Sequence, residues 1–151
     1  MKAVMFAASF GLALAGLPAI TMAACAAPSV RVNTLAALTT LLQSNTACVP
    51  PVTVDPMTWQ ELHVPGGALV DYKRGADTVD PSKQVGDWAV TGFDGRAFVR
   101  YRYGTAADLP APWQGGTYTY QVWDNQDGTH SFCGGIPAEI VGRIKLGGGA
   151  C

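Results

Sequence analysis

The feature that most constrains the fold is a run of alternating segments between residues 84 and 135. In Arg96–Tyr103, every second residue is apolar or aromatic, and arginines stand at most of the positions between. The members of the apolar set are Ala97, Val99, Tyr101 and Tyr103. Gly116–Asp124 alternates in the same way, with Tyr118, Tyr120 and Val122 on one side. Because successive side chains of a strand point to opposite faces of a sheet, these two sets are the predicted core face.

Short turns separate these segments and predict how they pair. Asp94-Gly95 is a tight-turn dipeptide, because both residue types tolerate positive φ, and it links Val85–Thr91 to the next strand. The segment Asn125–Gly128 is a second turn, and it leads into a strand over Thr129–Cys133. Short strands joined by short turns favour antiparallel pairing. We therefore predict a mainly β fold, an antiparallel up-and-down sheet or small barrel of about six to eight strands, with one short N-terminal helix.

The flanking segments complete this outline. Leucines recur at helical spacing in Thr34–Gln43, which predicts one short amphipathic helix laid on the sheet or over a barrel mouth. Either Asn33 or Thr34 can cap its N-terminus, because the side-chain oxygen accepts an otherwise unpaired backbone N–H. Prolines predict a loop over Cys48–Met57. The remaining predicted elements are a short extended piece at Val30–Val32, a hairpin of Thr58–Val64 and Ala68–Arg74, a proline-containing loop at Thr105–Gly115 and a last strand in Ile136–Leu146.

The N-terminal residues have the layout of an export signal. A charged Lys2 precedes an apolar run over Ala3–Ala15, and small residues follow to position 27. We predict a cleaved signal peptide over residues 1–26, with the cut between 23 and 26, and a single β-rich domain over residues 27–151. This prediction places the protein in the periplasm or outside the cell. Lipidation of Cys25 is an alternative, because Met22–Cys25 resembles a bacterial lipobox without its usual leucine.

Four cysteines, none in a CxxC pair, favour disulfides over a zinc ribbon or a thioredoxin-type motif. They are Cys25, Cys48, Cys133 and Cys151. Four cysteines allow three pairings, and we favour Cys133–Cys151 together with Cys25–Cys48, since each would fasten one chain end to the domain. If Cys25 is cleaved off or lipidated, one thiol stays unpaired, and Cys48–Cys133 or Cys48–Cys151 becomes the alternative.

Charge and motifs exclude several classes of partner. The chain has 10 basic and 11 acidic residues, so without Lys2 the balance is 9 against 11, a net charge of −2. This balance predicts no binding to nucleic acid, and the absence of a second apolar span in the sequence predicts no membrane-spanning segment in the mature chain. No sequence pattern points to a cofactor. A metal site would need both histidines, His63 and His130, plus carboxylates, and their spacing does not suggest one.

Two resemblances follow from particular segments. The chain resembles a group of small exported proteobacterial proteins in Leu41–Cys48, Trp59–His63, Gly66–Lys73, Val79–Pro81, Val85–Trp88, Ser131–Cys133 and the terminal Cys151. That resemblance covers nearly the whole mature chain and implies a bacterial, exported and uncharacterised protein, with no catalytic residues to carry over. Gly86-Asp87-Trp88 is similar to the Gly-x-Trp opening of lipocalin-type barrels, which implies a closed or nearly closed barrel.

Six residues are the candidates for binding: Trp59, Glu61, His63, Asp71, Trp113 and Trp123. Glu61 and His63 share one side of their strand, and a carboxylate can orient an imidazole for general-base work. A cross-strand polar network on a solvated face explains the same residues without chemistry. Trp113 lies in a proline-rich loop and Trp123 on the polar side of its strand, where exposed aromatic rings mark binding surfaces. Packing of Trp123 under the leucine helix is the alternative.

Three functional hypotheses are consistent with these observations. The first is a non-catalytic exported β-domain that binds an unknown protein or small ligand, such as a protease-inhibitor-like module with a contact loop in Ala106–Gly116. The second is a hydrolase-like enzyme that uses the Glu61, His63 and Asp71 hairpin. The third is a structural or self-assembling protein of the cell envelope whose exposed strand edges pair with further copies.

Overall fold

The computed structural model describes residues 25–49, 59–72, 83–104, 115–135 and 138–151. Most of the predicted signal peptide and the candidate Trp113 lie outside these ranges. In the described part of the chain, no helix has the length and hydropathy that a membrane crossing requires.

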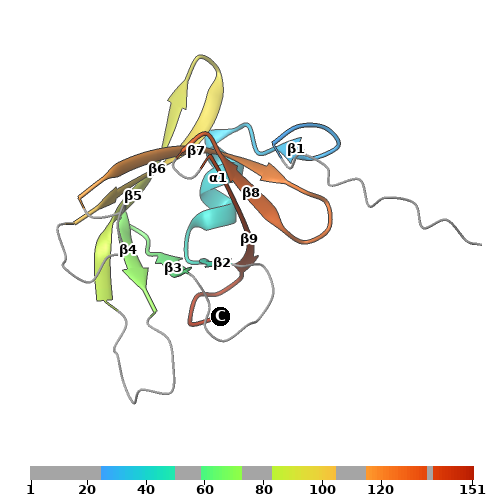
Figure 1. The fold of residues 1–151 in the computed structure, drawn as a ribbon. Coiled ribbons are helices and arrows are strands. Elements are labelled where there is room, and N and C mark those ends of the chain that lie inside the picture. The colour runs from blue at the N-terminus through green and yellow to red at the C-terminus, as the bar shows by residue number, and fades with distance from the viewer. Residues whose placement is uncertain (1–24, 50–58, 73–82, 105–114, 136–137) are drawn as a thin grey trace, which may run out of the picture.

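Eight antiparallel strands form a closed barrel (Figure 1). They are β2 (Thr46–Val49), β3 (Trp59–His63), β4 (Ala68–Asp71), β5 (Lys83–Phe93), β6 (Arg96–Tyr103), β7 (Thr117–Asp124), β8 (His130–Cys133) and β9 (Glu139–Lys145). Each strand pairs with the next along the chain, and β9 returns to pair with β2. The prediction of a mainly β, up-and-down fold is therefore confirmed, at the closed-barrel end of the predicted range.

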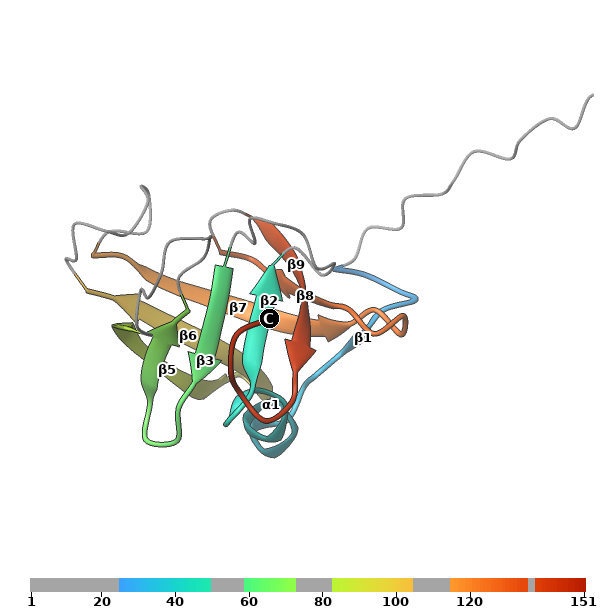
Figure 2. The same cartoon turned by 90° about the horizontal axis from the view of Figure 1, so that it is seen from below.

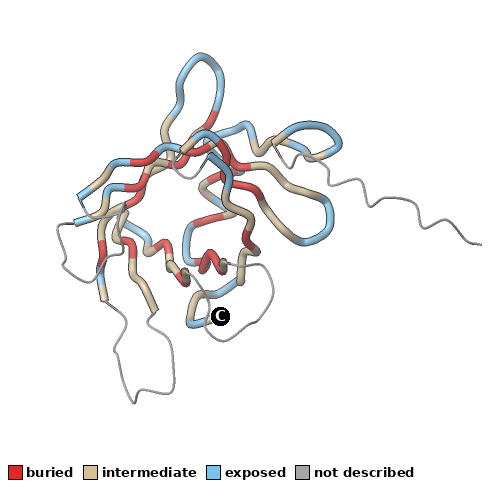
Figure 3. Tube along the Cα trace, viewed as in Figure 1, coloured by how far each residue is buried: buried red, intermediate tan, exposed pale blue. Residues whose placement is uncertain are grey.

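The predicted core faces of β6 and β7 point into the barrel. Ala97, Val99, Tyr101, Tyr120 and Val122 each expose 5% of their surface or less, and the trace of Figure 3 shows these strands alternating between buried and more exposed positions. In the pairing of β6 with β7, Val99 lies opposite Tyr120. Matched inward residues on neighbouring strands fill the interior, because opposite positions of an antiparallel pair share one face.

Turns and one bulge fix the register of β5. Asp94 and Gly95 have φ of 49° and 69°, the two positive values that a type I′ hairpin turn requires. At the other end of β5, the pairing with β4 shifts between Leu69 and Val70. Next to this irregularity, a Cβ on Gly86 would lie 2.0 Å from the carbonyl oxygen of Arg102. Only glycine allows β5 to approach β6 so closely at this position.

One short helix, α1 (Leu35–Leu42), packs at one end of the barrel (Figure 2). Thr34 caps it as predicted, since its hydroxyl accepts a hydrogen bond of 3.1 Å from the backbone N–H of Ala37. Leu38 and Leu42 are fully buried, and the helix contacts β5 and β6. The two-residue strand β1 (Val30–Arg31) lies outside the barrel, paired with the last residues of β7.

The sequence prediction missed β2, whose last two residues fall in the predicted loop Cys48–Met57. This strand is buried on both faces, so it lacks the alternation of apolar and polar residues that marks a half-solvated strand. Ala47 faces inward, while the outward Thr46 and Cys48 lie beneath the C-terminal residues. The Thr46 hydroxyl donates to the carbonyl of Gly149, over 2.9 Å.

The preferred cysteine pairing is wrong. The disulfides are Cys25–Cys133 and Cys48–Cys151, which span 108 and 103 residues of sequence. Strand β9 starts opposite Cys133 and runs away from it, so the last residues turn back over the outside of β2 and reach Cys48 instead. The bond from Cys25 to Cys133 occupies the sulfur that the lipid-anchor alternative would need. Two disulfides are typical of proteins outside the reducing cytosol.

Candidate functional site

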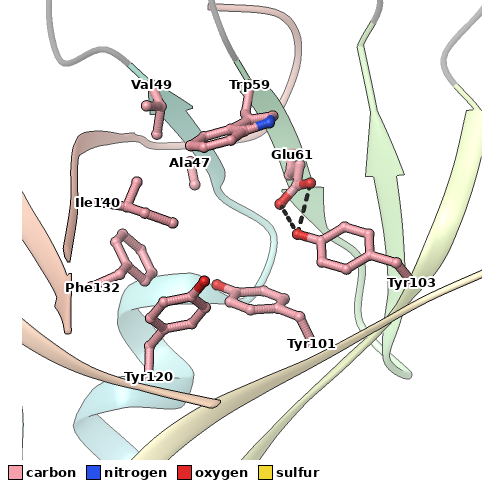
Figure 4. Close-up of a pocket in the computed structure, with 9 residues that line it drawn as sticks. All are labelled: Ala47, Val49, Trp59, Glu61, Tyr101, Tyr103, Tyr120, Phe132 and Ile140. Carbon is pink, nitrogen blue, oxygen red and sulfur yellow. Dashed lines mark hydrogen bonds between the residues drawn. The ribbon is translucent and has the colours of Figure 1, made fainter. Parts of the chain in front are cut away.

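A cavity lies inside the barrel at the end away from α1 (Figure 4). Its volume is about 40 Å³. Nine residues from six strands line it: Ala47, Val49, Trp59, Glu61, Tyr101, Tyr103, Tyr120, Phe132 and Ile140. Five of these described residues are aromatic, and Glu61 is the only one among them with an ionisable side chain apart from the tyrosines. The cavity is therefore an aromatic enclosure around one carboxyl group.

The depth of burial differs across the cavity wall. Tyr101, Tyr120 and Phe132 expose 5%, 1% and 4% of their surface and form the buried part. Trp59 and Glu61, both on β3, keep partial access to solvent. Gly135 belongs to the packing of the buried part, because a Cβ there would lie 2.1 Å from the Tyr120 ring. The wall thus grades from a dry interior to a partly accessible side that carries the carboxyl group.

Glu61 is held by a hydrogen bond from another strand. The Tyr103 hydroxyl on β6 lies 2.9 Å from each carboxyl oxygen of Glu61 and donates to them (Figure 4). Strands β3 and β6 are not neighbours, so this bond crosses the interior of the barrel. It fixes the carboxyl group against the aromatic wall, and the Tyr103 ring is itself 5.9 Å from the ring of Tyr118.

The environment of Glu61 favours its neutral form. Removal from bulk water raises the pKa of Glu61 to about 8, the hydrogen bond from Tyr103 partly offsets this effect, and the charge of Asp71 adds to it. Asp71 lies directly opposite Glu61 in the pairing of β3 with β4. A carboxyl group that titrates near neutral pH inside a cavity is a candidate functional group.

His63 lies on the same inward face of β3, two residues further along, but its surroundings differ. It is fully buried, its Nδ1 is 3.2 Å from the carbonyl oxygen of Asn45, and its Nε2 is 2.9 Å from the Tyr101 hydroxyl. A carbonyl can only accept, so Nδ1 donates and Nε2 accepts the hydroxyl proton of Tyr101. Burial lowers the pKa of His63 to about 4, although hydrogen bonds to the backbone of Asn45 and Glu61 act in the opposite direction.

These positions decide between the readings of the β3–β4 hairpin. A polar network on a solvated face is wrong, because Glu61 and His63 point into the barrel. The structure brings Glu61 and Asp71 together across two strands. It does not place a carboxylate on His63, whose two ring nitrogens bond to Asn45 and Tyr101.

Of the two remaining candidate tryptophans, Trp123 is described and is not among the residues that line this cavity. Trp123 lies opposite Arg31 of β1 and Ser131 of β8, on the outer face of β7, and is half-buried. Its position on the face opposite to Val122 argues against packing in the core beneath the leucine helix. Trp113 lies outside the described residues.

The described residues contain no group of three or more histidine, cysteine, aspartate or glutamate side chains placed to hold a metal ion. His130, the second histidine, pairs opposite Asp124 at the far end of β8. The two histidines therefore belong to different surroundings, His63 beneath the cavity and His130 beside the β7–β8 turn.

Sequence reasoning assigned several cavity residues to the core alone. The strand alternation correctly turned Tyr101, Tyr103 and Tyr120 inward, but it contained no sign that a cavity remained between them. Ala47 and Val49 were missed because their strand was not predicted, and Val49 fell in the predicted loop Cys48–Met57. One signal was present in the sequence: side chains alternate along β3, and this alternation places Trp59 and Glu61 on the same face.

No family model, curated protein or solved structure matches the chain. The site is therefore interpreted from its own geometry.

Proposed function

We propose that this chain is a small exported, non-catalytic β-barrel domain that binds a ligand or a protein partner at the cavity end of the barrel. The observation that carries this proposal is the carboxyl group of Glu61 enclosed by aromatic rings, with space left beside it. Natural cores leave few spaces larger than one water molecule. Binding sites, in contrast, combine apolar walls with a small number of convergent polar groups.

The opposite end of the barrel supports this assignment by contrast. There α1 and the buried Leu38 and Leu42 fill the interior, and the polar atoms of His63 are paired. Self-assembly through strand edges, the third hypothesis, has little support, because each of the eight barrel strands already has two neighbours. The two disulfides fit export to an oxidising compartment, either the periplasm or the medium.

A cavity-filling variant tests the proposal. Val49→Phe adds an aromatic ring to the lining, whereas Thr119→Phe adds the same ring on the exposed outer face of β7. We would screen the oxidised protein against a fragment library by NMR, following the indole signal of Trp59. We expect hits that Val49→Phe abolishes and Thr119→Phe retains. If both variants and the parent protein give the same hits, or if no fragment binds, this cavity is not the binding site.

An enzyme that uses Glu61 as acid or base is the second candidate. It is favoured by a pKa of about 8, which suits proton transfer at neutral pH. The version that combines Glu61, His63 and Asp71 is not supported, since His63 is fully buried with both ring nitrogens engaged. Turnover of an ester or glycoside panel that Glu61→Gln abolishes and Glu139→Gln retains would favour this candidate over simple binding.

A further inference from the structure

The chemistry of the cavity wall selects among classes of ligand. None of the nine described lining residues is basic, while Glu61 lies within the wall and Asp71 stands opposite it on β4. An anion would be repelled by the carboxylate form of Glu61. A purely apolar ligand would make no polar interaction with the carboxyl group of Glu61, so its affinity would not benefit from that group. A cation is the ligand whose charge this wall complements.

The aromatic rings favour the same charge. Tyr101 lies at the centre of the group, 6.1 Å from Tyr120 and 6.3 Å from Tyr103 between ring centroids, and Tyr120 is 6.3 Å from Phe132. Figure 4 shows Trp59 above these rings, beside Glu61. Ring faces carry partial negative charge, and they attract ammonium groups within about 6 Å of the centroid. Rings on several sides, together with one carboxylate, form a cage suited to a cation.

The volume limits what part of a ligand enters. A cavity of about 40 Å³ has room for about three water molecules, at roughly 10–15 Å³ for each. Pockets for drug-sized ligands begin at about 300 Å³. The space therefore fits the end of a narrow chain, such as a terminal CH₂–NH₃⁺ group, rather than a ring system.

We propose that this cavity binds the ammonium group of an alkylamine, with Glu61 as its counter-ion and the rings of Trp59, Tyr101 and Tyr103 as the surrounding π surfaces. This inference rests on the proposed binding function and names its ligand class. The amine is either a small free molecule or the side chain of a lysine on a partner protein, because both present the same group.

Binding of a cation should release a proton. In the empty cavity Glu61 is largely neutral at pH 7, because its pKa is about 8, and an ammonium ion favours the carboxylate form. Among the described residues, the ionisable groups that face Glu61 are Asp71 on β4 and Tyr101 and Tyr103 on β6. Both tyrosine pKa values are raised well above 10.0, so the tyrosines stay neutral. The apparent affinity should then rise by up to tenfold per pH unit from about pH 6 to about pH 8.

The test compares three probes of one shape that differ in charge: n-butylammonium, 1-butanol and butyrate. The chain contains only two glutamates, Glu61 and the exposed Glu139, so ¹³C-labelled glutamate gives two carboxyl signals, one of them an internal control. We expect n-butylammonium to bind at least about tenfold more tightly than 1-butanol and to move the Glu61 signal towards the carboxylate position at pH 7. Acetyl-lysine amide, with acetyl-norleucine amide as its neutral match, distinguishes a side-chain ligand from a free amine.

Three variants sharpen the result. Glu61→Gln should weaken n-butylammonium binding about tenfold or more and remove its pH dependence, whereas Glu139→Gln should change neither. Trp59→Leu should weaken binding about five- to thirtyfold, and Trp59→Phe less, because it keeps a ring. Binding of 1-butanol or butyrate at this cavity, as tight as that of n-butylammonium, would overturn the cation proposal and leave the binding function intact. Loss of all binding, including every fragment hit, would overturn both.

Discussion

Two ionisable residues lie two positions apart on the inward face of β3, and their surroundings in the barrel differ. His63 lies at the α1 end, where both ring nitrogens have hydrogen-bond partners and the ring packs edge-on against Trp88, 5.0 Å between centroids. Glu61 lies at the cavity end, held by Tyr103 with space beside it. Burial lowers the pKa of His63 and raises that of Glu61, so both are mainly neutral at pH 7.

The difference separates a structural polar group from a functional one. A buried group whose donors and acceptors are all satisfied specifies a unique packing, and His63 connects the helix–strand link at Asn45 to the central Tyr101. A carboxyl group that is removed from bulk water and lines a cavity can bond to a ligand there. Sequence position does not make this distinction, since both residues share one strand and one face.

The largest expected effect is on the stability provided by His63. His63→Leu should lower the free energy of unfolding by about 2–4 kcal/mol, because the Tyr101 hydroxyl loses its acceptor in the core. Glu61→Gln should not lower it at neutral pH, because the amide accepts from Tyr103 as the neutral carboxyl does and, unlike Glu61, needs no proton uptake on folding. Urea unfolding of the oxidised protein measures both.

A second substitution tests why His63→Leu should lower stability, because it removes the Tyr101 hydroxyl that has lost its acceptor. Adding Tyr101→Phe to His63→Leu should recover about 1 kcal/mol or more, since two apolar groups then replace a broken hydrogen bond. Equal losses from His63→Leu and Glu61→Gln, or no recovery in the double variant, would show that the two ends of the barrel do not differ in this way.

The next effect is the pH dependence of stability, in which the two residues oppose one another. The pKa of Glu61 is raised from 4.5 to about 8 by folding, so its contribution is complete below about pH 4.5 and is lost as pH rises to about 8. The pKa of His63 is lowered from 6.5 to about 4, so its contribution is complete above about pH 6.5 and is lost as pH falls to about 4. Each of these changes in unfolding free energy approaches about 1.4 kcal/mol per pH unit, and the two cancel between about pH 4.5 and about pH 6.5.

Variants separate the two slopes. Stability should fall above about pH 6.5 in the parent protein, and Glu61→Gln should flatten that fall. His63→Leu should extend the fall down to about pH 4.5, because the opposing slope of His63 is then absent. NMR titration gives the same information residue by residue, with Glu139 and His130 as the other members of each pair. A Glu61 signal that titrates near 4.5 would contradict the assigned burial of the carboxyl group.

The parts of this fold that the sequence predicts are those in which one face is clearly more apolar than the other. In β6 and β7, alternation identified Tyr101 and Tyr120 as inward, and the Asp94-Gly95 turn set their hairpin. The closed barrel follows from a simple meander of such strands. The helix was predicted within a residue at each end, because its cap and leucine stripe are both local signals.

Long-range contacts explain what could not be predicted. The outward face of β3 carries Gln60 and Leu62, and Gln60 is buried because the C-terminal residues fold over it and the Cys151 N–H bonds to its side chain. That cover hides which face is the interior, and it also sets the cysteine pairing. The hydrogen bond of Glu61 with Tyr103 joins strands that are not neighbours, so no pattern of spacing within either strand indicates it.

The smallest predicted effect concerns that single hydrogen bond. Tyr103→Phe keeps the ring and removes the donor, so the pKa of Glu61 should rise further above 8, because the bond from Tyr103 lowers it. The folded protein should lose about 1 kcal/mol, and n-butylammonium should bind more weakly at pH 7 because the carboxylate forms less readily. The carboxyl ¹³C titration of Glu61 measures the first effect, with Glu139 expected to stay unchanged. A pKa that falls or stays constant would mean that Tyr103 does not hold the carboxylate, and the cavity would then resemble the helix end of the barrel more closely than its geometry indicates.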